Sequence, residues 1–350
     1  MARIENMATA LPPHIVPQAL AQAAYTMLFE GTPAAPRLAA LFDHSGVERR
    51  YFAFPPTYYL SGKGFDERNA DYVEKGLELA EKAARACMER AGVEPGQIDH
   101  LILTTTTGLA TPSLDALLAP RLGLRAGVRR WPLFGLGCAG GAGALVRADE
   151  VLQGHPDQRA LVVSVELCGQ TFTPKATDPV DAVGGALFGD GAAAVLVAGE
   201  ATGARGPRVV ASQSVLFEDS KHIMGWRFTS DGMRLVLSPE VTDLVRERFR
   251  PVAEEFLATI QLGLGDITHW ILHPGGRRII EAYQAALECG DGALSWTRNS
   301  LAKVGNLSSA SVLFVLDDVL QGAAPKTGDW AFLAAPGPGF GVEMMALAWE

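Results

Sequence analysis

The segment Gly135-Leu-Gly-Cys-Ala-Gly-Gly-Ala-Gly143 places a single cysteine between an apolar run and a stretch of small residues. The apolar run, residues 131–134, is predicted as a strand, and the small residues as a helix that continues to Leu152. A helix N-terminus stabilises an anion, so we expect the pKa of the Cys138 thiol to be depressed. The glycines let the backbone approach closely and leave room for a substrate carbonyl beside the sulfur. Cys138 is therefore a candidate nucleophile, and a buried structural cysteine is the alternative.

Apolar runs alternate with helical patterns on both sides of this segment. In the first half we predict helices over 67–92 and 116–122 and strands over 100–107, 160–166 and 192–198. In the second half we predict strands over 209–217, 269–273 and 330–335 and helices over 277–287, 308–320 and 244–262, the last interrupted by Pro251. This alternation favours an α/β fold. Glycines and charged residues cluster at 199–207, so we expect two halves, 1–205 and 206–350, and a duplicated architecture.

The composition excludes several classes of protein. The chain has 350 residues, 48% hydrophobic and 20% charged, as in soluble globular proteins, and its net charge of −9 argues against a nucleic-acid partner. Its four cysteines form no CxxC pair, so we expect no zinc site and a reducing compartment. The uncharged stretch 6–29 contains Pro12, Pro13 and Pro17, which break a membrane-spanning or signal helix. We therefore expect a cytoplasmic protein with no targeting segment and no integral membrane segment.

Two further motifs supply a histidine and an asparagine. In Trp270-Ile-Leu-His-Pro-Gly-Gly-Arg-Arg278 a predicted strand ends at His273 and the chain then turns, which presents the imidazole to a cleft. A hydrogen-bonded core histidine is the alternative. In Val304-Gly-Asn-Leu-Ser-Ser-Ala-Ser311 the asparagine Asn306 precedes a predicted helix, where an N-cap role is the alternative. Together with Cys138 they suit carbonyl chemistry: a thiolate to attack, an imidazole to support it and an amide to donate to an oxyanion.

Two glycine motifs complete the set, Leu187-Phe-Gly-Asp-Gly-Ala-Ala-Ala194 and Ala335-Pro-Gly-Pro-Gly-Phe-Gly341. Both are predicted turns, and neither has the pattern of a phosphate-binding loop. In their order and spacing the five motifs resemble those of the type III polyketide synthases, the chalcone synthase-like family of condensing enzymes, over nearly the whole chain. The resemblance implies a duplicated, thiolase-like α/β fold with the layers αβαβα.

The resemblance also implies a role for each residue of the triad. Cys138 would carry the acyl chain as a thioester, and His273 and Asn306 would hold the thioester oxygen while malonyl-CoA loses carbon dioxide. His273 as an imidazolium would keep the thiolate ionised at neutral pH. The negative charge would go to an enolate oxygen held by hydrogen bonds, so no metal or redox cofactor is expected and the CoA thioesters are substrates.

Further positions follow from the same resemblance. Phe188 would be the gatekeeper between a CoA tunnel and the reaction cavity. The cavity would be lined by Thr106, Cys168, Thr171, Trp226, Leu235 and Ser308. CoA contacts are expected at Arg50, Gly275, Gly276, Arg277 and Arg278, and a loop that governs cyclisation at Gly337, Pro338 and Gly339. Thr111 lies where the family sends a residue across the subunit interface, so we expect a homodimer.

The starter is expected to be an acyl-CoA of medium or long chain. Val165-Glu-Leu-Cys-Gly-Gln-Thr-Phe172 and Met224-Gly-Trp-Arg-Phe-Thr229 are most similar to the bacterial alkylpyrone synthases, which extend long-chain acyl-CoA with malonyl-CoA. Leu235 stands where plant enzymes have a second gatekeeper Phe, and Trp226 where they have a Gly. The resemblance therefore implies alkylpyrone or alkylresorcinol products, not plant chalcones.

Three alternative functions stay open at this point. A ketoacyl-ACP synthase III has the same triad and fold, although its catalytic His is followed by Gln-Ala-Asn where this chain has Pro-Gly-Gly. A cysteine hydrolase also uses Cys, His and Asn, and it would release a free acid without consuming malonyl-CoA. A catalytically silent partner subunit would show no turnover.

Overall fold

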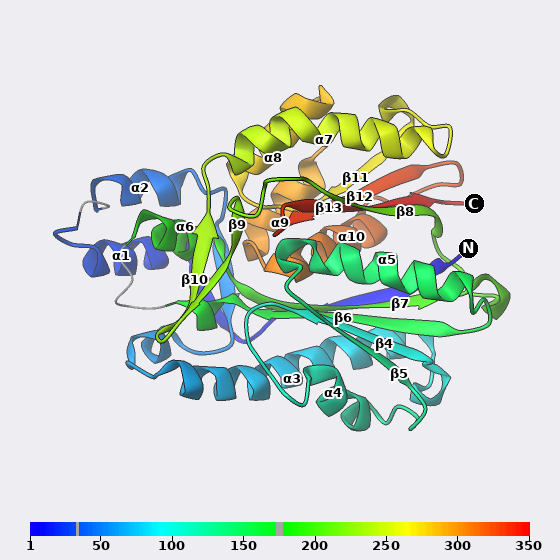
Figure 1. Ribbon diagram of the computed structural model, residues 1–350, viewed down its shortest axis with the longest axis horizontal. Coiled ribbons are helices and arrows are strands. Elements are labelled where there is room, and N and C mark those ends of the chain that lie inside the picture. Colours follow the sequence, from blue (N-terminus) through cyan, green and yellow to red (C-terminus); the bar gives the residue numbers. More distant parts are fainter. Residues whose placement is uncertain (33–34, 173–177) are drawn as a thin grey trace.

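The computed structural model describes residues 1–32, 35–172 and 178–350, and Figure 1 shows the course of the chain. The first half contains β1 (Arg3–Ala10), β2 (His14–Pro17), α1 (Gln18–Leu28), α2 (Ala35–Asp43), β3 (Arg49–Phe52), α3 (Phe65–Ala91), β4 (His100–Thr105), α4 (Leu114–Leu122), β5 (Arg129–Phe134), α5 (Gly140–Gln153), β6 (Arg159–Leu167), α6 (Pro179–Leu187) and β7 (Asp190–Ala198). The second half contains β8 (Arg208–Leu216), β9 (Met224–Thr229), β10 (Gly232–Leu237), α7 (Val241–Ala258), β11 (His269–Leu272), α8 (Arg277–Leu287), α9 (Ser295–Val304), α10 (Ser311–Gly322), β12 (Trp330–Gly337) and β13 (Gly341–Ala348).

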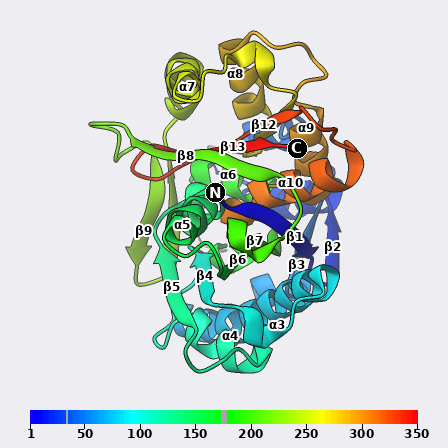
Figure 2. The same cartoon turned by 90° about the vertical axis from the view of Figure 1, so that its right-hand side faces the viewer.

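The main sheet of the described residues has nine strands in the order β11-β12-β13-β8-β1-β7-β6-β4-β5. Its two groups of strands meet at β1 and β8, where the pairing is confined to Arg3 and Arg208. Figure 2 shows α5 and α10 between these two groups, with α3 and α4 outside the first and α7 and α8 outside the second. The layers therefore follow the order αβαβα, and the predicted thiolase-like α/β fold is confirmed.

Small residues allow α5 and α10 to share the central layer. A Cβ at Gly141 would lie 2.2 Å from the carbonyl oxygen of Ser309, so only glycine permits this approach. Ala144 and Ala148 of α5 belong to the same buried cluster as Leu313 of α10. The close packing brings the N-terminal ends of the two helices together at the centre of the molecule, and each end is preceded by a predicted site residue.

Several elements differ from the prediction. The helix expected over 244–262 is α7, which ends at Ala258 and retains Pro251 inside it. β1 was not predicted, although it lies in the middle of the sheet. Its polar residues mask the apolar pattern, and ion pairs accommodate them, such as Glu5 with Arg159 at 2.8 Å. The segments α1 and α2 and the hairpin of β9 and β10 were also not predicted. In the described parts of the chain, no helix has the length and hydropathy needed to cross a bilayer.

Candidate active site

Cys138 lies in a 3-10 turn, Gly137–Ala139, that leads from β5 into α5. The turn depends on Gly137, whose φ is +50° and whose Cβ, if present, would lie 2.5 Å from Cδ of Pro338. The Cys138 side chain is 9% exposed. Its Sγ donates to Oγ of Ser308 over 3.9 Å, so the cysteine faces the start of α10.

His273 follows the last residue of β11. Its N–H donates to the carbonyl of Ala334 at 3.0 Å and so continues the parallel pairing of β11 with β12. The N–H of Gly275 donates back to the carbonyl of His273 at 2.9 Å, which closes the turn. The imidazole is 2% exposed, and neither ring nitrogen has a hydrogen-bond partner among the residues that the structure describes. A core histidine would be hydrogen-bonded, so this alternative is not supported.

Asn306 lies between α9 and α10 and uses its two amide atoms differently. Its Oδ1 accepts from the N–H of Ser308 at 2.8 Å, which is the local turn role that was the alternative for this residue. Its Nδ2 donates to the carbonyl of Gly275 over a long 3.3 Å, on the loop that follows His273. A chain of contacts thus links Cys138, through Ser308 and Asn306, to the histidine loop.

Burial shifts the pKa values of the cysteine and the histidine in opposite directions. Desolvation raises the pKa of the Cys138 thiol to about 12 and lowers the pKa of His273 to about 3. Both shifts favour the neutral forms, contrary to the depressed thiol pKa and the imidazolium expected from the sequence. Desolvation is the largest cause of both shifts, because the closed site removes water from the sulfur and from the imidazole.

A buried carboxylate that sequence reasoning missed lies beside this site. Glu166 of β6 is fully buried, and desolvation raises its pKa while hydrogen bonds oppose the rise. It accepts from the N–H of Thr106 at 3.0 Å, from Oγ1 of Thr107 at 2.7 Å and from Oγ of Ser309. Oγ1 of Thr106 also lies 3.5 Å from Oγ of Ser308. A charged residue in an otherwise apolar predicted strand was the signal that could have identified it.

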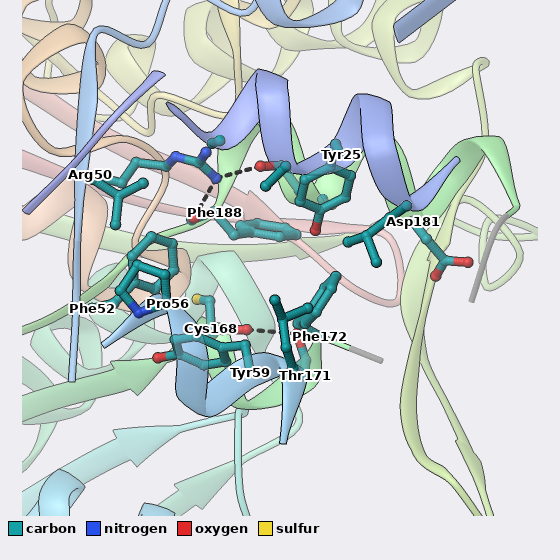
Figure 3. A pocket seen from close by; sticks show the side chains of 18 of the residues that line it. Tyr25, Arg50, Phe52, Pro56, Tyr59, Cys168, Thr171, Phe172, Asp181 and Phe188 are labelled. Atoms are coloured by element: carbon teal, nitrogen blue, oxygen red, sulfur yellow. Dashed lines mark hydrogen bonds between the residues drawn. The ribbon is translucent and has the colours of Figure 1, made fainter. Parts of the chain in front are cut away.

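A largely apolar cavity of about 190 Å³ lies next to the triad (Figure 3). It brings together five of the residues predicted for the reaction cavity and its gate: Cys168, Thr171, Phe188, Trp226 and Leu235. Burial raises the pKa of the Cys168 thiol, and a charge on Cys138 raises it further, so the two cysteines are close. Thr106 and Ser308 lie on the triad side and do not line this cavity.

The opposite wall of the cavity comes from residues that the sequence did not indicate. Helix α1 and the turn Pro56–Leu60 supply Leu20, Ala21, Ala24, Tyr25, Leu28, Tyr59 and Leu60. Figure 3 shows the rings of Tyr25 and Tyr59 on either side of Phe188. The residues of α1 lie in the uncharged stretch 6–29, which the sequence marked only as unfit to cross a membrane.

The residues expected to contact CoA occupy two different environments. Arg50 is 2% exposed and donates to the carbonyls of Gly185 and, at 3.1 Å, Phe188. Arg277 and Arg278, by contrast, are exposed at the start of α8, beside Gly275 and Gly276. The CoA contacts of these residues stay predictions, but Arg50 faces inward rather than toward solvent.

The loop of Gly337, Pro338 and Gly339 packs directly against the turn that carries Cys138. A Cβ at Gly337 would lie 2.4 Å from the carbonyl oxygen of Leu136 and 2.6 Å from Cβ of Ala139. The two turns therefore require glycine on both sides of their contact. This loop of the second half therefore fixes the turn of the first half that carries Cys138.

Comparison with known proteins identifies the family. The model for the N-terminal domain of chalcone and stilbene synthases matches residues 1–201, and that for the C-terminal domain matches residues 208–348. A 1,3,6,8-tetrahydroxynaphthalene synthase of Streptomyces peucetius subsp. caesius is 45% identical over 97% of this chain and 91% of its own length. A putative chalcone synthase of Bacillus subtilis (strain 168) is 34% identical over 100% of this chain and 99% of its own.

Solved structures agree with these relatives. The crystal structure of 1,3,6,8-tetrahydroxynaphthalene synthase from Streptomyces coelicolor A3(2), a bacterial type III polyketide synthase, covers 99% of both chains with a TM-score of 0.95 and 25% identity. The crystal structure of PKS-I from the brown alga Ectocarpus siliculosus is similar with a TM-score of 0.91 and 27% identity, covering 100% of this chain and 98% of its own. The chain therefore belongs to the chalcone and stilbene synthase family and is a type III polyketide synthase, an acyltransferase.

Proposed function

We propose that Cys138 carries the growing acyl chain and that His273 and Asn306 generate the nucleophile that extends it. In the loading step the Cys138 thiol attacks the acyl-CoA carbonyl, its proton passes to His273, and CoA leaves as its thiol. Because burial keeps the thiol neutral, the base must act as the sulfur attacks. The unpartnered ring nitrogens of His273 leave the imidazole free for this transfer.

The second step forms an enolate from malonyl-CoA. The bond to the carboxylate breaks, carbon dioxide leaves, and the electron pair enters the enolate of acetyl-CoA. A ring N–H of His273 and the Nδ2–H of Asn306 donate to the enolate oxygen, and the weak 3.3 Å bond of Nδ2 to Gly275 is easily exchanged for it. The enolate carbon then attacks the Cys138 thioester, a carbon–carbon bond forms, and the sulfur leaves as the thiolate. Residues of the chain thus supply the whole step, and we propose that no cofactor takes part.

The proposed starter substrate is inferred from the apolar cavity. Its walls are mainly aliphatic and aromatic side chains, and it begins at Phe188 and Cys168, next to the nucleophile. Burying a methylene group in such a site stabilises a bound chain by about 0.8 kcal/mol. We therefore assign the cavity to a medium- or long-chain acyl group, with alkylpyrones or alkylresorcinols as products.

A second candidate product follows from the relatives. The Streptomyces peucetius protein at 45% identity is named for 1,3,6,8-tetrahydroxynaphthalene, which has no alkyl chain. A chain that grows toward a naphthalene also needs space beside the nucleophile, so the product assay below decides between the two candidates.

We also propose a homodimer in the cytoplasm. Thr111 is exposed on the loop between β4 and α4, as is Leu109 on the same loop, and the large apolar side chains of Trp131 and Phe134 are exposed on the neighbouring strand β5. An exposed apolar patch of this kind marks a protein contact. Light scattering should report twice the chain mass of 37.1 kDa at micromolar concentration, and a value near 37.1 kDa would exclude the dimer.

One product assay tests the proposed function. Purified protein is incubated with malonyl-CoA and, in turn, acetyl-CoA, coumaroyl-CoA, dodecanoyl-CoA or palmitoyl-CoA, and products are identified by mass spectrometry. We expect pyrones or resorcinols that retain the long alkyl chain, with the highest kcat/KM for the long starters. Tetrahydroxynaphthalene from malonyl-CoA alone would favour the second candidate. Free fatty acid without consumption of malonyl-CoA would contradict both.

A further inference from the structure

The gatekeeper and the catalytic asparagine share one piece of backbone structure. The N–H of Asn306 donates to the carbonyl of Leu187 at 2.8 Å, and the N–H of Gly189 donates to the carbonyl of Asn306 at 3.0 Å. These two bonds form an isolated parallel bridge between Phe188 and Asn306, outside any sheet. A shift of Phe188 therefore also moves Asn306. Because the bridge is not part of a sheet, other residues must hold it in place.

Arg50 supplies this support from β3. Its guanidinium donates to the carbonyls of Gly185 and Phe188, and Figure 3 draws both bonds as dashed lines that begin at Arg50. Its aliphatic stem fills the space beside the bridge on both sides. A Cβ at Gly189 would lie 3.3 Å from Cβ of Arg50, and one at Gly305 would lie 2.8 Å from its Cγ. Glycine on each side of the bridge thus makes room for the stem.

The surroundings of Arg50 agree with a permanent internal role. Desolvation lowers the pKa of its guanidinium to about 10, which leaves it protonated at neutral pH. The phenol of Tyr25 and the carboxyl group of Asp190 act on this charge from α1 and β7. The side chain is 2% exposed, and its Nη1 donates to two main-chain carbonyls, whereas Nε has no partner among the described residues. A CoA phosphate arriving from solvent would therefore find little of this side chain exposed.

We propose that Arg50 is a positioning residue that holds the bridge of Phe188 and Asn306, and that it does not act by contacting CoA. Through the bridge it aims Nδ2 of Asn306 at the substrate oxygen and sets the place of the Phe188 ring at the mouth of the cavity. This inference rests on the roles proposed above for Asn306 and Phe188. It replaces the CoA contact that the sequence predicts for Arg50.

Two substitutions and two substrates test the proposal. Arg50→Met keeps an aliphatic side chain and removes the hydrogen-bond donors. Arg50→Lys keeps the positive charge but replaces the planar guanidinium with a single ammonium group. Arg90→Met is the matched control, because Arg90 of α3 also donates to a main-chain carbonyl, that of Met7, and does not line the cavity. Each protein is assayed with malonyl-CoA and with malonyl-N-acetylcysteamine, which has the same thioester without the nucleotide.

If Arg50 is a positioning residue, the rate of decarboxylation should fall by the same factor with malonyl-CoA and with malonyl-N-acetylcysteamine. For Arg50→Met we expect kcat of decarboxylation to fall about tenfold to a hundredfold with little change in KM, because a misplaced catalytic group costs rates of this order. Arg50→Lys should lie between this variant and the wild type. Acylation of Cys138 should stay close to wild type, and the Gly189 and Asn306 amides should exchange hydrogen faster. Arg90→Met should match the wild type in all four measurements.

Each other outcome is decisive. A KM that rises for malonyl-CoA only would show a CoA contact and overturn the inference. Decarboxylation and acylation that fall together with the folded fraction would show a merely structural residue. If Arg50→Met does not fold, Arg50→Lys gives the same readouts. A wild-type protein that does not decarboxylate malonyl-CoA would remove the proposed function and this inference together, whereas wild-type rates in both Arg50 variants would overturn the inference alone.

Discussion

The proposed halves, 1–205 and 206–350, place a helix of the same kind at the same central position but give it different chemistry. In the first half the turn Gly137–Ala139 presents Cys138 ahead of α5. In the second half Asn306 and the turn Ser308–Ala310 precede α10. One helix start thus presents the proposed nucleophile, and the other presents the proposed hydrogen-bond donor. The comparison teaches that a duplicated fold can divide a reaction between equivalent positions through the side chain alone.

Each half also holds the functional residue of the other. The turn of Cys138 is packed by Gly337 and Pro338, which belong to the second half. The backbone of Asn306 is bonded to Leu187 and Gly189, which belong to the first half. The site therefore depends on the packing of both halves, and we expect changes on either side to separate the two proposed steps of the reaction.

The largest effect is expected from Cys138→Ala. This change removes the sulfur that carries the chain, so elongated products and covalent acylation of the protein should both be abolished. The readouts are product formation and intact-protein mass after incubation with an acyl-CoA. Cys289→Ala serves as the control, because Cys289 is the only half-exposed cysteine among the described residues and lies outside the site. Acylation of the Cys138→Ala protein would show that another residue is the nucleophile.

The next largest effect is expected at Asn306, the proposed hydrogen-bond donor in the second half. Asn306→Ala removes one hydrogen bond to the enolate oxygen, so decarboxylation of malonyl-CoA should fall by roughly 100-fold or more. Acylation of Cys138 should fall far less, because the thiol and His273 are unchanged. The exposed Asn299 of α9 provides a matched control, Asn299→Ala, with wild-type rates. If Asn306→Ala lowered the rates of acylation and decarboxylation by the same factor, the two steps would not be divided between the halves.

Most of the central layer could be predicted from the sequence, because its motifs combine glycine with a reactive side chain. Cys138, His273 and Asn306 lie where glycine turns meet the ends of regular elements, a pattern that is visible without a structure. The outer wall of the cavity could not be predicted. Tyr25 and Leu28 are ordinary residues of α1, and only packing against α6 gives them a role. The pKa of Cys138 was also predicted in the wrong direction, because burial depends on the whole fold.

The pH dependence of alkylation separates the two possible charge states of the proposed nucleophile. Because burial raises the pKa of Cys138 and lowers that of His273, we expect a thiol and a neutral imidazole in the substrate-free site at neutral pH. The thiolate fraction then rises with pH, and alkylation of Cys138 by iodoacetamide should rise roughly tenfold per pH unit between pH 6 and 9. Mass spectrometry of the alkylated peptide gives the rate. A rate independent of pH over this range would show a thiolate–imidazolium pair instead.

The smallest effect concerns the cavity, whose walls come from both halves. Trp226 of β9 lies with its ring centroid 6.4 Å from that of Phe188. Trp226→Leu should lengthen the cavity and raise the kcat/KM ratio of palmitoyl-CoA to dodecanoyl-CoA, by about fourfold for each extra methylene buried. Phe228→Leu, on the same hairpin but exposed, should leave the ratio unchanged. A lower ratio in Trp226→Leu would mean that the alkyl chain lies elsewhere.

The division of the reaction between the halves is tested most directly by acetyl-CoA release from malonyl-CoA in Cys138→Ala and in Asn306→Ala, measured side by side. The first protein lacks the carrier but retains both enolate donors, and the second retains the carrier but lacks one donor. We expect acetyl-CoA release to persist in Cys138→Ala and to fall by roughly 100-fold or more in Asn306→Ala. Loss of release in a folded Cys138→Ala protein, or unchanged release in Asn306→Ala, would contradict the account.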